Sequence, residues 1–149
     1  MLRKIIKIIL VICCLFTIFM FSNDNGIASS KKSDTVIISS IKLFTNKKLN
    51  NKIKKKYINK YVFLVRKIAH FIIYLILGLL VISLLEEYMI LDKRVLLLTI
   101  IFVLLYACSD ELHQYFIPGR EGRIGDVLLD TFGGGIGELI YYVFRRNRL

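Results

Sequence analysis

Cysteine and proline are scarce in this chain of 149 residues, and each shortage narrows what the protein can be. The three cysteines, Cys13, Cys14 and Cys108, lie in apolar segments and form no CxxC pair. The sequence therefore predicts neither a disulfide framework nor a zinc site. Pro118 is the single proline. With Gly119 it fits the two central positions of a type II turn, in which the glycine has positive φ.

Acidic residues are also few, and the resulting charge limits the choice of partners. The chain has 11 acidic residues against 22 lysines and arginines, and 12 of these 22 lie between Lys31 and Lys67. Such an excess indicates nucleic acid, anionic lipid or another polyanion. The basic region carries no zinc-knuckle, RNA-recognition or helix-turn-helix pattern, so we expect no nucleic-acid partner. Membrane lipids with anionic headgroups, or lipid-linked envelope precursors, are the expected partners.

Apolar residues are abundant and occur in blocks separated by charge. They make up 56% of the chain, and the mean hydropathy is +0.61, more than an ordinary soluble domain carries. Inside a bilayer every backbone polar group needs an internal partner, which favours α-helices. We therefore predict one all-α membrane domain over residues 1–149 with a basic linker over 22–67. Its four spanning helices are expected at 5–21, 68–85, 95–108 and 127–144.

The linker contains a second helical pattern. From residue 49 to 65, apolar residues fall at helical spacing while most lysines lie on the other side. This pattern predicts a basic amphipathic helix in the plane of an anionic membrane surface, between spanning helices one and two. A solvated lysine-rich loop is the alternative. The first apolar segment could be a signal peptide, but the later spans favour an uncleaved signal-anchor helix.

Four spans place both termini on one side of the membrane. Three cations, Arg3, Lys4 and Lys7, lie at the N-terminal end of the first span and three follow the last span, which favours cytoplasmic termini. A count over all segments gives 8 lysines and arginines inside and 14 outside for this orientation. We still expect cytoplasmic termini, because the first helix usually sets orientation and the basic cluster is mostly distant from it. The loop between helices three and four is then extracytoplasmic.

Ionisable residues concentrate at the membrane side that carries this loop. His70 and Tyr74 are four residues apart and share a helix face, and Asp126 and Asp130 repeat this spacing. Charged groups cost about 2.5–3.5 kcal/mol each at the bilayer centre and less near its surface, so they tend to face the bundle interior and pair. The arginines predicted to pair are Arg120 and Arg123, with Asp110, Glu111, Asp126 and Asp130. This cluster either holds the helices together or binds a ligand.

Two further patterns concern metals and helix packing. Asp110, Glu111 and His113 could ligate a metal, but their spacing matches no established signature, and we predict no metal and no other cofactor. Gly133 and Gly137 form a small-xxx-small pattern typical of closely packed membrane helices, and Gly78 lies on the helix face of His70. We predict helix packing at these three glycines. The glycine face would also allow oligomers.

These segments together resemble the VanZ-like family of small bacterial membrane proteins. The resemblance is carried by FSNDNGIASSKKS (21–33), RKIAHFIIYLILG (66–78), DELHQYFIPGR (110–120), DVLLD (126–130) and GGGIG (133–137). The chain departs from the family in having Asp24 in place of glutamine and Asp130 in place of asparagine. Each departure adds negative charge.

The resemblance implies a multi-pass protein of the bacterial cell membrane, from a family whose founding members are linked to low-level teicoplanin resistance and which has no agreed reaction. We expect a non-enzymatic envelope protein whose polar cluster binds a lipid headgroup or a lipoglycopeptide. The alternative is a membrane-embedded enzyme acting on a lipid-linked phosphate or sugar. The candidate binding residues are Arg66, Lys67, His70, Tyr74, Asp110, Glu111, His113, Gln114, Arg120, Asp126 and Asp130.

Overall fold

The computed structural model describes residues 1–24, 33–39 and 51–147, and these form helices without strands. The four long helices are α1 (Leu2–Asn23), α3 (Asn51–Leu85), α4 (Lys93–Tyr115) and α5 (Ile124–Arg146). Each contains a stretch long and apolar enough to cross a membrane. A short helix over 33–39 lies between α1 and α3. The predicted all-α fold with four spanning helices and a helix between the first two is confirmed, but this helix lies at 33–39, whereas residues 51–65 of the predicted amphipathic helix belong to α3.

The helices are longer than the apolar blocks predicted. α3 begins at Asn51, so the described part of the basic segment is continuous with the second span. No proline or glycine interrupts the chain between residues 51 and 77, which is why one helix continues. At its start α4 is capped by Asp92, whose side chain accepts from the backbone N–H of Arg94 at 2.8 Å. At its other end α4 continues to Tyr115, seven residues beyond the predicted end.

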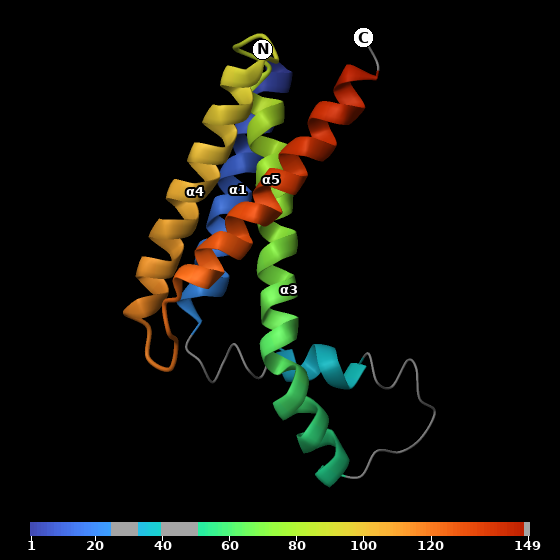
Figure 1. Cartoon of the computed structure of the whole chain (residues 1–149), viewed down its shortest axis with the longest axis vertical. Helices are drawn as coiled ribbons and strands as arrows, with labels where there is room; N and C mark the ends of the chain where they lie inside the picture. The colour runs from blue at the N-terminus through green and yellow to red at the C-terminus, as the bar shows by residue number, and fades with distance from the viewer. Residues whose placement is uncertain (25–32, 40–50, 148–149) are drawn as a thin grey trace.

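The helices form a bundle with two distinct ends (Figure 1). Both chain termini lie at one end, and the loop between α4 and α5 lies at the other, near the end of α1. The first turns of α3 extend past the bundle at this second end. Ile18, Tyr74, Leu77 and Val103 are at most 1% exposed and form the centre of the core. Many apolar side chains on the outer faces remain exposed, as expected for helices that meet lipid.

Glycines allow α5 to cross α3 at very close range. A Cβ added at Gly137 would lie 2.0 Å from the carbonyl oxygen of Leu75, and one at Gly78 would lie 2.0 Å from that of Gly134. At Gly133 the distance to the carbonyl oxygen of Phe71 would be 2.7 Å. The two backbones therefore touch at positions that only glycine can occupy. Within the chain, the glycine face of α5 is covered by α3.

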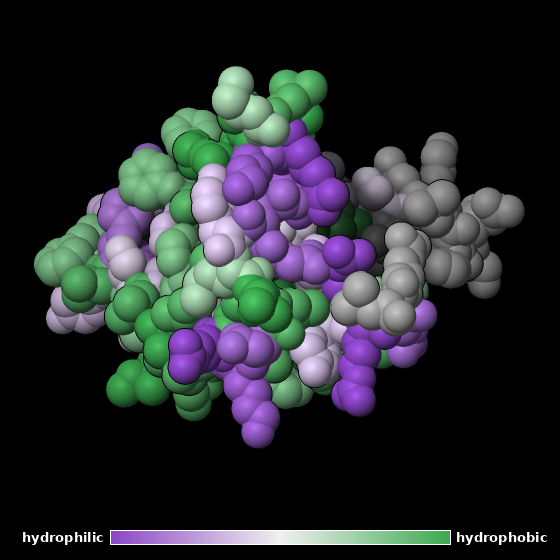
Figure 2. Space-filling model, turned by 90° about the horizontal axis from the view of Figure 1, so that it is seen from above, coloured by the Kyte–Doolittle hydropathy of each residue, from purple (hydrophilic) through white to green (hydrophobic). Residues whose placement is uncertain are grey.

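Ion pairs tie the helices together at the end that carries the termini. Glu87 accepts from Lys7 at 2.5 Å, and Glu86 accepts from Arg145 at 2.5 Å. The hydrogen bond from Lys7 lowers the pKa of Glu87 below its ordinary value. Burial opposes ionisation of Glu86, but hydrogen bonds from Arg145 and Tyr141 outweigh it and lower the pKa of Glu86. In the view onto this end, hydrophilic residues gather over part of the surface, with hydrophobic residues exposed around them (Figure 2).

Candidate functional site

A cavity of about 440 Å³ opens at the end of the bundle that carries the α4–α5 loop. We call it the polar cavity, because charged side chains from α3, α4, α5 and the loop dominate its lining. The residues that line it are Phe63, Arg66, Lys67, His70, Glu111, Gln114, Gly119, Arg120, Glu121, Arg123, Asp126, Leu129 and Asp130. Its volume lies in the usual range of small-molecule sites, about 300–1,000 Å³.

Arg120 joins the loop to the end of α1. Its Nε donates to the carbonyl oxygen of Asp24 at 2.9 Å, and its Nη2 donates to that of Phe21 at 2.6 Å. Its Nη1 donates to Oε1 of Gln114 at 2.8 Å. The last carbonyls of a helix lack partners within the helix and attract cations. We call these three hydrogen bonds the Arg120 bridge. Through it, the α4–α5 loop supplies donors to the carbonyls at the C-terminal end of α1.

The loop is shaped so that Arg120 can reach these acceptors. Gly119 has φ 77°, as the predicted turn requires, and the Arg120 N–H donates to the Ile117 carbonyl at 3.1 Å. Further along, Glu111 accepts from the backbone N–H of Arg123 at 2.9 Å, which holds the loop against α4. Burial lowers the pKa of Arg120 below its ordinary value, an effect to which the nearby Arg66 adds.

The predicted pairing of both arginines with the helix acids is wrong. Arg120, only 9% exposed, binds carbonyl oxygens and an amide rather than a carboxylate. Arg123 pairs through its guanidinium with the exposed Glu121 at 2.5 Å. Main-chain acceptors at the end of α1 are nearer to Arg120, and Glu121 is only two residues from Arg123.

A different cation neutralises the first acid of α5. Lys67 on α3 forms an ion pair with Asp126, so this contact joins two helices across the cavity. The Lys67 Nζ also lies 4.7 Å from the centre of the Phe63 ring, a cation–π distance. Arg66 faces the cavity and pairs with no acid in the part of the chain that the structure describes. The cavity thus has one arginine without an acidic partner among the described residues and two cations, Lys67 and Arg123, that pair with acids in its lining.

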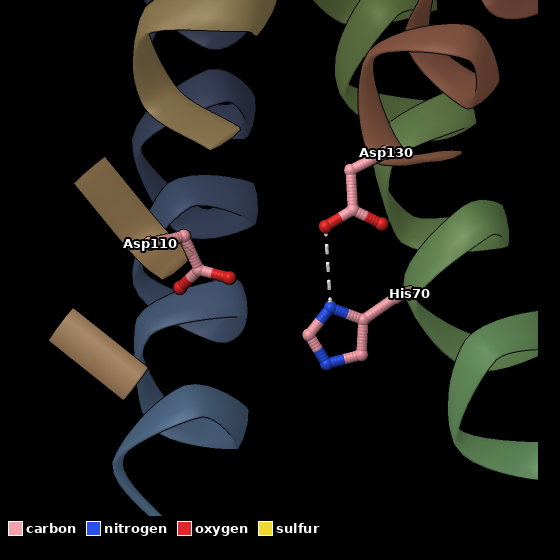
Figure 3. A group of neighbouring side chains, drawn as sticks. All are labelled: His70, Asp110 and Asp130. Carbon is pink, nitrogen blue, oxygen red and sulfur yellow. Dashed lines mark ion pairs between the residues drawn. The ribbon is translucent and has the colours of Figure 1, made fainter. Parts of the chain in front are cut away.

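The inner wall of the cavity includes His70 and Asp130, and Asp110 lies next to them on α4. His70 Nδ1 lies 3.5 Å from Oδ2 of Asp130, and Asp110 faces both from α4 (Figure 3). Gln114 donates through Nε2 to Asp110 at 2.9 Å and to the Ser22 hydroxyl at 3.3 Å. Both aspartates are at most 5% exposed. Charged groups from three helices therefore meet at the depth where α1 ends.

An apolar groove of about 230 Å³ adjoins the polar cavity. It runs between α1, the short helix over 33–39 and α3. The residues that line it are Ile18, Phe21, Asp24, Ser33, Val36, Val65, Arg66, Ala69, His70, Ile73 and Arg120. Arg66, His70 and Arg120 line both spaces. A ligand with a charged end and an apolar end would find both environments side by side.

Comparison with known proteins bears on this site directly. The sequence matches the VanZ/LLP1 family over residues 7–145, nearly the whole chain. The chain belongs to the VanZ/LLP1 family. No curated protein and no solved structure matches it. Within this VanZ/LLP1 protein, the segments 21–24, 66–78, 110–120 and 126–130 contain the residues of the Arg120 bridge and most residues that line the polar cavity.

Most candidate residues of the VanZ/LLP1 protein meet at the cavity, but His113 does not. Its ring stacks on Phe19 with centroids 5.0 Å apart, and its Nε2 has no hydrogen-bond partner among the described residues. The position next to Asp110 is taken by Gln114, one turn further along α4, which donates to it at 2.9 Å. Tyr74 is fully buried below His70, and its hydroxyl also lacks a hydrogen-bond partner in the described ranges.

Several residues of the site were missed in the sequence. Ser22 is completely buried and accepts from Gln114, Glu121 pairs with Arg123, and Phe63 lies beside Lys67. Ser22 belongs to the segment that resembles the family, so its position gave a usable signal. The sequence gave no signal for the carbonyls of Phe21 and Asp24, because every residue has a backbone carbonyl.

Proposed function

We propose that this VanZ/LLP1 protein is a multi-pass protein of the bacterial cell membrane whose polar cavity binds the phosphate headgroup of an anionic lipid. The observation that supports the proposal is a cavity of about 440 Å³ with four cations in its lining, at the end of a bundle of four membrane helices. Helices that cross the apolar core of a bilayer end near the level of the lipid phosphates. An arginine fork can bind a phosphate with two parallel hydrogen bonds.

The cations available for a phosphate are Arg66, Lys67 and Arg123. Arg66 has no acidic partner among the described residues, and the Arg123–Glu121 pair is 52% and 74% exposed on its two side chains. Exposed ion pairs contribute little to stability, so a phosphate can replace Glu121 at small cost. Arg120 is unsuited to this role, because Nε and both Nη atoms already donate to protein acceptors.

The adjoining apolar groove supports a lipid as the source of the phosphate. Val36, Val65 and Ile73 offer an acyl chain an apolar surface beside the cavity. A free phosphate would gain nothing from this groove. We propose that the headgroup occupies the polar cavity and one acyl chain the groove.

Lipid binding at this face would connect the protein to envelope properties. Members of the VanZ-like group are linked to teicoplanin, a glycopeptide that carries a lipid chain, as the sequence resemblance implies. We propose that occupation of the cavity, by a lipid or by such a lipoglycopeptide, alters envelope assembly or lowers drug accumulation at the membrane. An effect on glycopeptide susceptibility then depends on an intact polar cavity.

The proposed function places the α4–α5 loop outside the cytoplasm. In a Glu121→Cys variant, the new thiol is expected to react with a membrane-impermeant maleimide on intact cells, because Glu121 is 74% exposed in the loop. Wild type serves as the control, since Cys13, Cys14 and Cys108 lie within the spans. Labelling that requires disrupted cells would place the loop in the cytoplasm and contradict the orientation.

Headgroup binding is tested with the full chain in phosphatidylcholine nanodiscs that contain phosphatidic acid as the probe. Bound lipid is counted by native mass spectrometry. Each of Arg66→Ala and Arg123→Ala is expected to weaken binding about fivefold, because a cation near an anionic headgroup contributes roughly 1 kcal/mol. Lys93→Ala is the matched control, an exposed cation at the opposite end.

The outcomes of this experiment separate the candidate functions. Equal binding by wild type and an Arg66→Ala/Arg123→Ala double variant would contradict the proposal. Displacement of phosphatidic acid by teicoplanin would identify the lipoglycopeptide as a second ligand of the cavity. Recovery of a chemically altered lipid would instead support the membrane-embedded enzyme that the sequence leaves open.

A further inference from the structure

His70, Asp110 and Asp130 bring three metal-binding groups together from three helices. One ligand atom from each lies within 4.8 Å of the other two. Figure 3 shows the imidazole and the two carboxylates turned toward a common space. The residues come from α3, α4 and α5, at positions 40 and 20 residues apart in the chain. No spacing motif in the sequence could have shown this arrangement.

The distances suit ligands of one ion better than hydrogen bonds. His70 Nδ1 and Asp130 Oδ2 lie 3.5 Å apart, too far for a strong hydrogen bond. Two ligands of a tetrahedral ion with bonds of about 2.1 Å lie roughly 3.4 Å apart.

Asp130 supplies an independent sign that something is bound. It is 1% exposed, and neither of its carboxylate oxygens has a hydrogen-bond partner within the described residues. Buried carboxylates are expensive unless they are paired or bind a metal. The Tyr74 hydroxyl, one turn beyond His70 on α3, is also buried and has no hydrogen-bond partner among the residues that the structure describes.

Apart from His70, the charged side chains nearby do not neutralise the carboxylates of Asp110 and Asp130. Asp110 accepts a hydrogen bond from Gln114, which is neutral. Arg120 is directed at Gln114 and at the end of α1, and Lys67 pairs with Asp126. Two buried carboxylates therefore face each other with only His70 between them. A dication would balance both.

We propose that His70, Asp110 and Asp130 bind a divalent transition-metal ion in the wall of the polar cavity. One imidazole and two carboxylates form a donor set that suits Zn²⁺ or Mn²⁺, whereas Mg²⁺ and Ca²⁺ favour oxygen ligands alone. His70 and Asp130 line the cavity, so the ion has an entry path and its remaining coordination positions face the cavity. The inference does not depend on lipid binding.

Zn²⁺ is the probe for this site. The full chain is purified in an uncharged detergent, stripped with EDTA and titrated with Zn²⁺ by calorimetry in the absence of anionic lipid. We expect one saturable site per chain. Asp130→Asn, which preserves shape and removes the charge, is expected to weaken binding by at least about 100-fold, and His70→Gln to do the same.

Two matched variants define the outcome. Asp126→Asn removes a cavity carboxylate outside the cluster, and His113→Gln removes the other histidine; both are expected to bind Zn²⁺ like wild type. Absence of saturable binding by wild type would overturn the proposal, and so would equal affinities of wild type, Asp130→Asn and His70→Gln. Because no phosphate lipid is present, this result is separate from success or failure of headgroup binding.

Discussion

Replacing Arg120 with alanine is expected to lower the free energy of unfolding by about 3–5 kcal/mol. The substitution removes three hydrogen bonds from a charged side chain that is only 9% exposed. It also removes one donor from each of the carbonyls of Phe21 and Asp24 at the end of α1. A loss of this size would remove much of the stability of an ordinary small protein.

Unfolding of the purified protein in detergent measures this effect, with helix content followed by circular dichroism. Arg120→Lys should recover only part of the stability, because an ammonium is compact and cannot reach acceptors as widely separated as those of a planar guanidinium. Arg123→Ala is the control, since its guanidinium pairs with the exposed Glu121 and lies 5.7 Å from the centre of the Phe63 ring. If Arg120→Ala and Arg123→Ala were equally stable, the bridge would have no role in folding.

A methyl group at Gly137 is expected to separate α3 from α5. In Gly137→Ala the new Cβ would lie 2.0 Å from the carbonyl oxygen of Leu75, a backbone atom that cannot rotate away. Overpacking of this kind typically costs about 1–3 kcal/mol, and the shortness of this contact places the expected cost at the upper limit or above. The cavity end would be disturbed as well, because Asp130 is carried by the same helix.

Gly125→Ala provides a control, because its expected effect on stability has the opposite sign. Nothing lies within 4 Å of a Cβ added at Gly125, which is in the first turn of α5. Alanine is favoured over glycine in helices by up to about 1 kcal/mol, so this variant should be as stable as wild type or slightly more stable. Thermal unfolding in detergent compares the two variants, and equal stability of Gly137→Ala and wild type would disprove tight contact between the helices.

Hydropathy blocks were sufficient to predict the helices but not their ends. Charge marks where a helix leaves the apolar part of the bilayer, and α3 and α4 both continue past that point. Lys67 and Asp110 were recognised as polar, yet polarity alone does not end a helix. The ends are set instead by local features such as the Asp92 cap and the Gly119 turn, of which only the turn was recognised.

The location of the site was predictable, whereas its contacts were not. Four spans require that the end of helix one, the start of helix two and the α4–α5 loop share a side, and the polar cavity lies where they meet. Contacts depend on the rotation of each helix about its axis. The rotation of α3 brings His70 close to Asp130, and the rotation of α4 directs His113 toward Phe19. The spacing of residues along one helix does not show how that helix is rotated relative to its neighbours.

The Arg120 bridge has a consequence for biogenesis. It joins positions 96 and 99 residues apart, so a ribosome that adds about 5–20 residues per second makes the acceptors roughly 5–20 s before the donor. The Lys7–Glu87 pair needs only α1 and α3, and it becomes available earlier. The order of synthesis then sets the order in which contacts become available: the Lys7–Glu87 pair comes first, the Arg120 bridge follows, and the Glu86–Arg145 pair, which needs the end of α5, comes last.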